Sequence, residues 1–284
     1  MILIPGNSGC EIEIVSSDKR SIVRKTTRDK EYIRRLRAQF LKQISFSGFL
    51  SKFKNIDTPQ IFHSSLSDNQ EFSFSMEYKN FLDCIGFFSF AKKDDIDLFF
   101  NLILSFIKSE VDFCKNKKNC MKEFIAKYNS TISKINKAKD IPDSLFSKIN
   151  DKIYESNHML IPVGICHGDL TMSNILVSRD FKNLSFIDFL DNFVETPLQD
   201  MVKIRQDTRF LWTSHLYSKC FDDVRNRIIM EYLDNLFHNS FLEYEFYRDN
   251  YERFQILNIL RIFRYTSSKE TKRYLTACLE SMCD

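Results

Sequence analysis

Glycine and proline are scarce in this chain of 284 residues, with six and five copies respectively. An all-β sandwich or barrel needs many tight turns, which depend on such residues, so the composition excludes this kind of fold and favours long helices. No apolar run approaches the roughly 20 residues that span a bilayer. The first residues also lack the basic segment and cleavage pattern of a signal peptide. We therefore expect no membrane partner and a cytoplasmic protein.

An excess of one charge and metal-binding cysteine pairs are also missing. Lysine and arginine number 41 against 38 aspartates and glutamates, a formal net charge of +3. This excess is too small to predict a nucleic-acid partner. The eight cysteines include no Cys-x-x-Cys pair, so we expect no zinc site and interpret the thiols as small apolar side chains in a reducing compartment.

The first 80 residues are rich in expected strands. Short runs of β-branched residues, some alternating with polar ones, are separated by turn residues. The expected strands are Ile2–Ile4, Glu11–Val15, Ser21–Thr26, Gln60–Ser64 and Glu71–Glu77. A helix is expected from Asp29 to Ser45, with Asp29 as its N-cap. The apolar face expected for this helix consists of Ile33, Leu36, Phe40, Leu41 and Ile44.

After Asn80 the apolar residues recur mostly at helical spacing. The expected helices are Asp94–Cys114, Met121–Lys137 and Ser144–Asn157, followed by helical periodicity from Pro197 onward. Short strands are expected at Val163–Cys166, Ile175–Val177 and Leu184–Ile187. We predict an α+β fold with two lobes. Residues 1–78 would form a small lobe with a five-stranded antiparallel sheet and one helix, and residues 79–284 a larger, mainly helical lobe.

Three polar side chains near the predicted 175–187 hairpin are candidates for chemistry. Asp169 and Asn174 are five residues apart in a loop, and Asp188 ends the strand that follows. Folding the hairpin brings an amide and two carboxylates to one end of a small sheet. Such oxygen ligands suit Mg²⁺, which binds through few protein groups together with substrate phosphates. With Asn174 and Asp188 on the metal, Asp169 remains to meet a substrate hydroxyl, as a phosphoryl-transfer site requires.

The sequence His-Gly-Asp-x-x-x-x-Asn at 167–174, followed by Ile-Asp-Phe at 187–189, resembles the signature of the kinase-like small-molecule phosphotransferases. This family includes the aminoglycoside phosphotransferases and the choline and ethanolamine kinases, and its lobe order is similar over nearly the whole chain. The resemblance implies a protein-kinase-like bilobal fold. It also implies transfer of the γ-phosphoryl group of ATP, or of another nucleoside triphosphate, to a hydroxyl of a sugar, amino sugar or amino alcohol. Asp169 would orient that hydroxyl and take its proton, whereas Asn174 and Asp188 would hold Mg²⁺.

The resemblance also assigns nucleotide-binding groups in the first lobe. Lys25 lies where the third strand of the family supplies a lysine to the α- and β-phosphates. Further contacts would come from Asn7, Ser8 and Gly9 over the phosphates, and from Met76, Glu77 and Tyr78 at the adenine. Many relatives pair the strand lysine with a glutamate of the first helix. Here the expected position holds Gln39, and Glu31 lies nearer the start of the helix, so the partner of Lys25 stays open.

Two other classes of function remain as alternatives. The glutamine at position 39 and the sparse glycines of the predicted phosphate-covering turn favour a nucleotide-binding pseudokinase or scaffold. The presence of Asp169, Asn174 and Asp188 favours turnover. A protein kinase is disfavoured, because only eleven residues separate Asp188 from Asp200, too few for an activation segment and a peptide platform. Arg261 and Arg264 would either bind an anionic group of the acceptor or pair on the surface. The sequence names neither the acceptor nor the oligomeric state.

Overall fold

The computed structural model describes residues 2–4, 9–17, 20–66, 71–135, 141–263 and 265–284. Contacts divide the chain into two compact units. The first consists of Met1–Ile103, His167–Asp191 and Tyr217–Ile229, and the second of Leu104–Cys166, Asn192–Leu216 and Met230–Asp284. The fold is α+β, as predicted, and the lobe boundary expected at residue 78 stays a prediction. No helix in the described part of the chain has the length and apolar character needed to cross a membrane.

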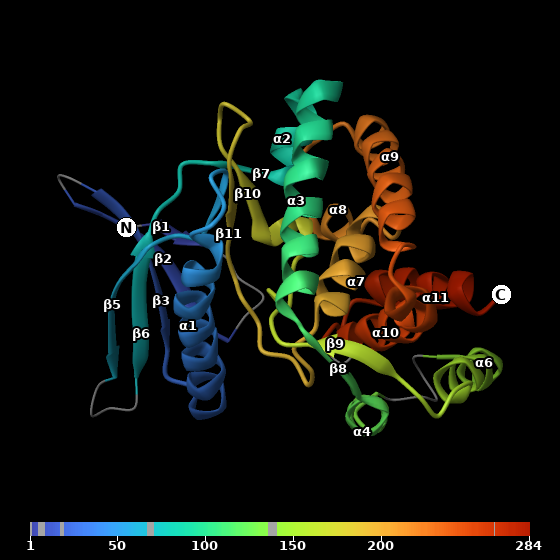
Figure 1. Ribbon diagram of the computed structural model, residues 1–284. Helices are drawn as coiled ribbons and strands as arrows, with labels where there is room; N and C mark the ends of the chain where they lie inside the picture. The colour runs from blue at the N-terminus through green and yellow to red at the C-terminus, as the bar shows by residue number, and fades with distance from the viewer. Residues whose placement is uncertain (1, 5–8, 18–19, 67–70, 136–140, 264) are drawn as a thin grey trace. The chain divides into compact units, whose positions relative to one another are not determined.

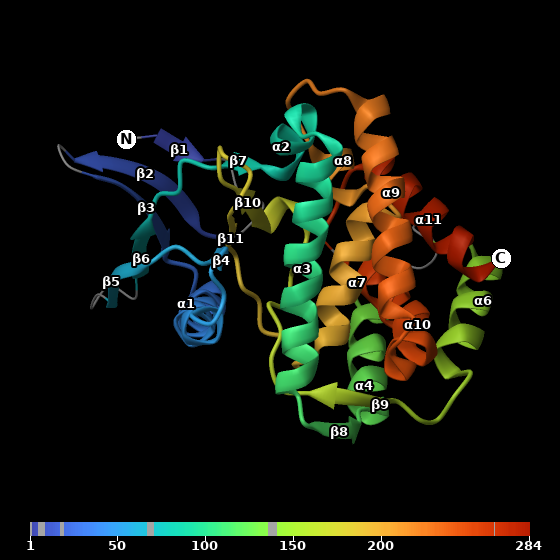
Figure 2. The ribbon, with the colours of Figure 1, turned by 45° about the horizontal axis from the view of Figure 1, so that its top comes forward.

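The first unit contains a five-stranded antiparallel sheet with one long helix against it (Figures 1 and 2). Its strands are β1 (Ile2–Ile4), β2 (Glu11–Ser17), β3 (Arg20–Thr27), β5 (Ile61–Leu66) and β6 (Phe72–Glu77). They are arranged in the order β1-β2-β3-β6-β5, so the central position of β3 places its residues between β2 and β6. The five predicted strands are therefore confirmed.

The helix α1 (Lys30–Leu50) begins as predicted but ends five residues later. The carboxylate of Asp29 accepts hydrogen bonds from the backbone N–H groups of Glu31 at 2.8 Å and Tyr32 at 3.0 Å, which satisfies two donors at the helix start. Phe46 and Leu50 are buried, so apolar contacts continue one turn beyond the predicted end.

Two residues of the apolar face predicted for α1 were assigned wrongly. Leu36 is fully buried and packs with a cluster of sheet residues, whereas Leu41 is 59% exposed and Ile44 46% exposed. The sheet residues of this cluster are Phe72, Phe74 and Met76. Leu41 follows Leu36 by five residues, about 140° round a helix of 3.6 residues per turn, so both cannot face the sheet. Gln43, seven residues after Leu36 and therefore on the same face of the helix, is buried instead, and its amide donates to the Pro59 carbonyl at 2.9 Å.

The two leucines of α1 should therefore respond very differently to truncation. We expect Leu36→Ala to lower the free energy of unfolding by about 2–5 kcal/mol, because it leaves a cavity in the core of the first unit. Leu41→Ala should change it by no more than about 0.5 kcal/mol, as is usual for exposed positions. Urea unfolding monitored by circular dichroism measures both, and equal losses would contradict the assignment of the two faces.

A second, smaller sheet carries the motif. Its strands are β4 (Ile56–Asp57), β7 (Leu82–Asp83), β10 (Ile175–Val177) and β11 (Leu184–Phe186), in the order β4-β11-β10-β7. The antiparallel pair β10–β11 was predicted. The strands β4 and β7 have only two residues each, too few to show any periodicity in the sequence. A short 3₁₀ turn at Met172–Asn174 precedes β10, and α2 (Cys84–Phe90) follows β7.

The second unit is mainly helical. Its helices include α4 (Met121–Ile132), α6 (Asp143–Tyr154), α7 (Pro197–Thr208), α8 (Trp212–Leu216), α10 (Glu245–Phe263) and α11 (Lys269–Cys283). Two further helices, α3 (Lys93–Phe113) and α9 (Asp223–Phe241), contribute residues to both units. Helix α7 is buried along its whole length, and α10 packs against α7, α11 and α4. Arg205 of α7 is buried in an ion pair with Asp234 at 2.6 Å.

The strand predicted at Val163–Cys166 lies three residues earlier. It is β9 (Leu160–Val163), and it pairs with β8 (Asn116–Asn119) beside α4 (Figures 1 and 2). All four side chains of β8 are exposed and polar, so the sequence has no apolar alternation there. Backbone pairing with β8, rather than side-chain pattern, therefore decides where β9 begins and ends.

Candidate active site

Asp169 and Asn174 lie in contact in the loop that precedes β10. The amide Nδ2 of Asn174 donates to the backbone carbonyl of Asp169 at 2.7 Å and to Asp169 Oδ2 at 3.1 Å. Backbone bonds from Thr171 N–H to the Asp169 carbonyl, and from Asn174 N–H to the Thr171 carbonyl, tighten the same turn. Asn174 is buried, and its Nδ2 orients the Asp169 carboxylate. The other polar atom of the Asn174 side chain, Oδ1, is the one suited to bind a cation.

Asp188 is placed beside Asn174 by the end of the β10–β11 hairpin. The N–H of Ile187 donates to the carbonyl of Asn174 at 3.0 Å, directly before Asp188. Asp188 itself has a φ of 61°, in the left-handed region that non-glycine residues seldom adopt. Residues held in such conformations cluster at active sites and ligand clamps.

Lys25 reaches the motif from the central strand β3. The side chain of Lys25 is on the same face of the sheet as Val23, which packs on the apolar core. Lys25 is only 5% exposed. The ammonium group forms an ion pair with the carboxylate of Asp188. Burial alone would lower the pKa of Lys25, but the charge of Asp188 and its hydrogen bond outweigh burial and raise the pKa above its ordinary value. The ion pair that the structure shows for Lys25 thus joins it to Asp188, and not to Gln39 or Glu31.

His167 forms hydrogen bonds to the backbone on both sides of the motif, at Asp169 and at Ile187. Its Nδ1 accepts the backbone N–H of Asp169 at 3.3 Å, so its proton is on Nε2, which donates to the Ile187 carbonyl at 2.9 Å. The ring lies 4.3 Å from that of Phe189, centroid to centroid. Burial lowers the pKa of His167 to about 4. A neutral, fully buried imidazole with both ring nitrogens bonded to the backbone anchors the loop.

The lowered pKa of His167 predicts a loss of stability in acid. Between pH 6.5 and 4 the unfolded chain binds a proton at this histidine that the folded chain does not, so this contribution is complete above pH 6.5 and is lost as the pH falls towards 4. The full effect is about 3 kcal/mol. Urea unfolding at several pH values should show a shallower pH dependence for His167→Gln than for the native chain. An equal slope for His167→Gln and the native chain would contradict this assignment.

The predicted phosphate-covering turn is described only at Gly9. Asn7 and Ser8 lie outside the described residues. The carbonyl of Gly9 accepts a hydrogen bond from Thr27 Oγ1 at 2.9 Å. A Cβ at Gly9 would lie 2.8 Å from Cδ2 of Tyr32 on α1, so the close approach of the turn to the helix requires glycine there.

The predicted adenine-binding segment is the end of β6. Met76 is buried in the core, with its sulfur contacted by the amide of Gln43. The N–H of Glu77 donates to the Gln60 carbonyl at 2.8 Å, and that of Tyr78 to the Ser21 carbonyl at 3.4 Å. These two donors are therefore used within the sheet. A role for this segment in binding adenine stays a prediction.

The donor atoms of the motif fit Mg²⁺. Among the residues that the structure describes there is no group of three or more histidine, cysteine or acidic side chains able to hold a metal on their own. Asn174 and Asp188 offer one amide oxygen and one carboxylate. A site with few protein oxygens is the kind that Mg²⁺ occupies, because it completes its coordination with water and substrate phosphates.

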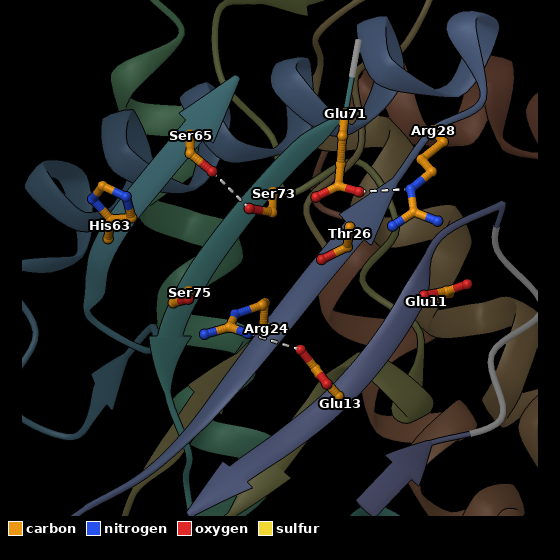
Figure 3. A pocket seen from close by; sticks show the side chains of 10 residues that line it. All are labelled: Glu11, Glu13, Arg24, Thr26, Arg28, His63, Ser65, Glu71, Ser73 and Ser75. Carbon is orange, nitrogen blue, oxygen red and sulfur yellow. Dashed lines mark hydrogen bonds and ion pairs between the residues drawn. The ribbon is translucent and has the colours of Figure 1, made fainter. Parts of the chain in front are cut away.

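Figure 3 shows a pocket of about 340 Å³ on the other face of the five-stranded sheet. Arg24 and Thr26 line it, and side chains alternate along β3, so the pocket opens away from Lys25. Its other lining residues are Glu11, Glu13, Arg28, His63, Ser65, Glu71, Ser73 and Ser75. The charged groups pair with one another, Arg24 with Glu13 and Arg28 with Glu71. This pocket therefore contains none of the motif residues.

The arginines considered as acceptor ligands are only partly described. Nη1 of Arg261 lies 3.4 Å from the side-chain oxygens of Asn192 and Asn258, all within the second unit. Arg264 lies outside the described residues. A role for Arg261 in binding an acceptor stays a prediction.

Sequence reasoning did not single out Lys42 of α1. Its ammonium group donates to the backbone carbonyl of Leu190 at 2.8 Å, two residues after Asp188. A lysine on a helix rich in basic residues has no distinguishing signal in the sequence. Its partner is a backbone atom 148 positions away, so only the tertiary structure reveals the contact.

Comparison with known proteins identifies the fold through structure and not through sequence. No protein-family model matches the chain, and neither does any curated protein sequence. Among solved structures, a thermostable mutant of aminoglycoside phosphotransferase APH(4)-Ia, in ternary complex with AMP-PNP and hygromycin B, is similar over 99% of this chain and 92% of its own, with a TM-score of 0.67 and 8% identity. The Plasmodium vivax ethanolamine kinase is similar over 100% of this chain and 81% of its own, with a TM-score of 0.55 and 15% identity.

The fold is that of the kinase-like phosphotransferases. A third similar structure is the GDP and kanamycin complex of APH(2")-IIia, which matches 95% of this chain and 92% of its own with a TM-score of 0.60 and 12% identity. The kinase-like fold expected from the motif is thereby confirmed. At these identities the likeness concerns the fold, so the chemistry of this chain has to be argued from its own residues.

Proposed function

We propose that this protein is an ATP- and Mg²⁺-dependent kinase that transfers the γ-phosphoryl group to a hydroxyl of a small metabolite, such as a sugar, amino sugar or amino alcohol. One chain of contacts carries the proposal. Lys25 pairs with Asp188, the residue before Asp188 bonds to Asn174, and Asn174 bonds to Asp169. A cationic amine, two oxygen ligands for a metal and a further carboxylate to meet the acceptor hydroxyl are the groups that phosphoryl transfer uses.

The roles follow from the chemistry of each group. Asp169 would accept the hydrogen bond of the acceptor hydroxyl and take its proton, held in place by the amide of Asn174. Asn174 Oδ1 and the Asp188 carboxylate would hold Mg²⁺, which when bound neutralises charge on the phosphate oxygens. With the metal on Asp188, the ammonium group of Lys25 would be shared with the phosphates. An amine at the end of a buried side chain suits that role, because it is already desolvated and fixed.

The similar structures support a nucleotide and a small acceptor. They include proteins bound to AMP-PNP with hygromycin B and to GDP with kanamycin, as well as an ethanolamine kinase. These acceptors differ widely in size and charge, so the fold does not select one of them. The choice between ATP and another nucleoside triphosphate is equally a matter for experiment.

Nucleotide consumption over a panel of acceptors tests this function. The panel comprises sugars, amino sugars, choline, ethanolamine and aminoglycosides, each with ATP or GTP, and Asp169→Ala serves as the inactive control. Consumption that depends on one acceptor, on Mg²⁺ and on Asp169 supports the kinase. Binding of the Mg²⁺–nucleotide without consumption across the panel would instead identify a nucleotide-binding scaffold.

A further inference from the structure

The backbone at Asp188 needs support from both sides. With a φ of 61° this residue occupies a conformation that is unfavourable for a side chain larger than glycine, and such conformations persist only where their surroundings hold them. On the preceding side, Ile187 is held by Asn174 through its N–H and by His167 through its carbonyl. Both of these contacts come from the motif loop.

On the following side, Leu190 is also held by two hydrogen bonds, one at its N–H and one at its carbonyl. Its N–H donates to the carbonyl of His167 at 3.1 Å, and its own carbonyl accepts from Nζ of Lys42 at 2.8 Å. Of these four bonds, the one from Lys42 is the one that comes from α1. Hydrogen bonds from a charged donor are shorter and stronger than those between neutral groups.

Lys42 and its neighbour Gln43 both donate hydrogen bonds from α1 to backbone carbonyls of other segments. Gln43 is buried and donates to the Pro59 carbonyl at 2.9 Å, next to β5 and β6. Successive side chains of α1 therefore bond to the segment after Asp188 and to the segment before β5. Because α1 also packs on the sheet through Leu36, the Leu190 carbonyl is attached to a rigid element.

We propose that Lys42 is a positioning residue that holds Asp188 in its metal-binding conformation, through the carbonyl of Leu190. This inference rests on the proposed function, because it takes Asp188 as a ligand of Mg²⁺. In this chain α1 is thus joined to the metal-binding segment by a lysine-to-carbonyl bond. The strand lysine Lys25, for its part, pairs with Asp188 itself.

Metal affinity in the presence of a non-hydrolysable nucleotide tests this role without turnover. Mn²⁺ replaces Mg²⁺, and its binding to the protein with AMP-PNP is followed by electron paramagnetic resonance. We expect Lys42→Met to weaken Mn²⁺ binding about tenfold or more, the usual effect of removing a group that orients a metal ligand. Affinity for AMP-PNP without metal, measured by calorimetry, should stay within about twofold of the native value. The reason is that the bond from Lys42 to Leu190 acts on the carboxylate of Asp188, which would bind the metal.

Two further variants separate positioning from a general effect on the helix. Lys42→Arg retains a charged donor and should recover most of the Mn²⁺ affinity. Arg37→Met removes a cation from an exposed position of α1 and should bind Mn²⁺ as the native chain does. If Lys42→Met does not fold, Lys42→Gln, which has a shorter neutral donor, replaces it and should show the same weakened Mn²⁺ binding.

The outcomes distinguish this proposal from the proposed function. Native Mn²⁺ affinity in a folded Lys42→Met or Lys42→Gln chain overturns the role of Lys42, even if its melting temperature falls, because that result means a purely structural contact. Equal losses in Arg37→Met and Lys42→Met also overturn it. If the native chain with AMP-PNP binds no Mn²⁺ at all, the failure is that of the proposed kinase site itself.

Discussion

Asp169→Asn is expected to lower the rate of phosphoryl transfer about 10²–10⁴-fold, the range associated with loss of a general base. Asparagine has nearly the shape of aspartate, and its side-chain oxygen can still accept the bond from Asn174 Nδ2. It cannot take the proton of the acceptor hydroxyl. The effect should therefore appear in kcat, measured by ADP release, whereas the Kd for AMP-PNP should remain unchanged.

Asp191 offers a matched control for this substitution. It is an exposed carboxylate three residues after Asp188, and we interpret it as a solvated loop residue. Asp191→Asn should retain native turnover. If both variants keep native turnover, the assignment of Asp169 as the base is wrong. If Asp169→Asn also loses AMP-PNP binding, the residue acts in binding and not in proton transfer.

Lys25→Met is expected to separate activity from stability. The lysine ammonium is buried, and removing it deletes the charge that would face the phosphates, so kcat/KM should fall about 10²–10³-fold. The fold should not suffer in proportion. Methionine suits the apolar surroundings near Val23, and the carboxylate left behind, that of Asp188, is 38% exposed and can be solvated. Removal of one partner is strongly destabilising where it leaves a buried charge unpaired, and the partial exposure of Asp188 avoids that cost here.

Thermal unfolding and turnover of the same preparation measure the two effects. The melting temperature of Lys25→Met should equal or exceed that of the native chain. The neighbouring Arg24 faces the other side of the sheet, where it pairs with Glu13, and Arg24→Met should keep native kcat/KM. A Lys25→Met chain that retains turnover would remove Lys25 from the site. A melting temperature that falls together with activity would mean that the ion pair to Asp188 is mainly structural.

The secondary structure near the motif was accessible from sequence because its signals are local. The hairpin of β10 and β11 shows two short apolar runs, and the first part of α1 has both a capping aspartate and a helical repeat. Signals fail where the deciding contact is remote. β8 has no apolar pattern, and the bounds of β9 follow from pairing with it. Helix geometry excludes Leu36 and Leu41 from facing the sheet together, and only the packing shows that Leu36 is the one that does.

The candidate site divides in the same way. Asp169, Asn174 and Asp188 lie within twenty residues of each other, so their spacing and the intervening strands predict that they meet. The contact of Lys25 with Asp188 joins residues 163 positions apart. The sequence left Gln39 and Glu31 as the candidate partners of Lys25, since it contains no record of which remote charge lies opposite a strand.

The amino-acid sequence alone determined the α+β class, the strands of the larger sheet and the polar groups of the motif, because composition, periodicity and short spacing act within a few residues. Only the tertiary structure decided that Lys25 pairs with Asp188, that Lys42 holds the Leu190 carbonyl and that Leu41 faces solvent. The physical reason is that burial and pairing depend on the distance between atoms in space, and chain folding brings together groups whose separation in sequence bears no relation to that distance.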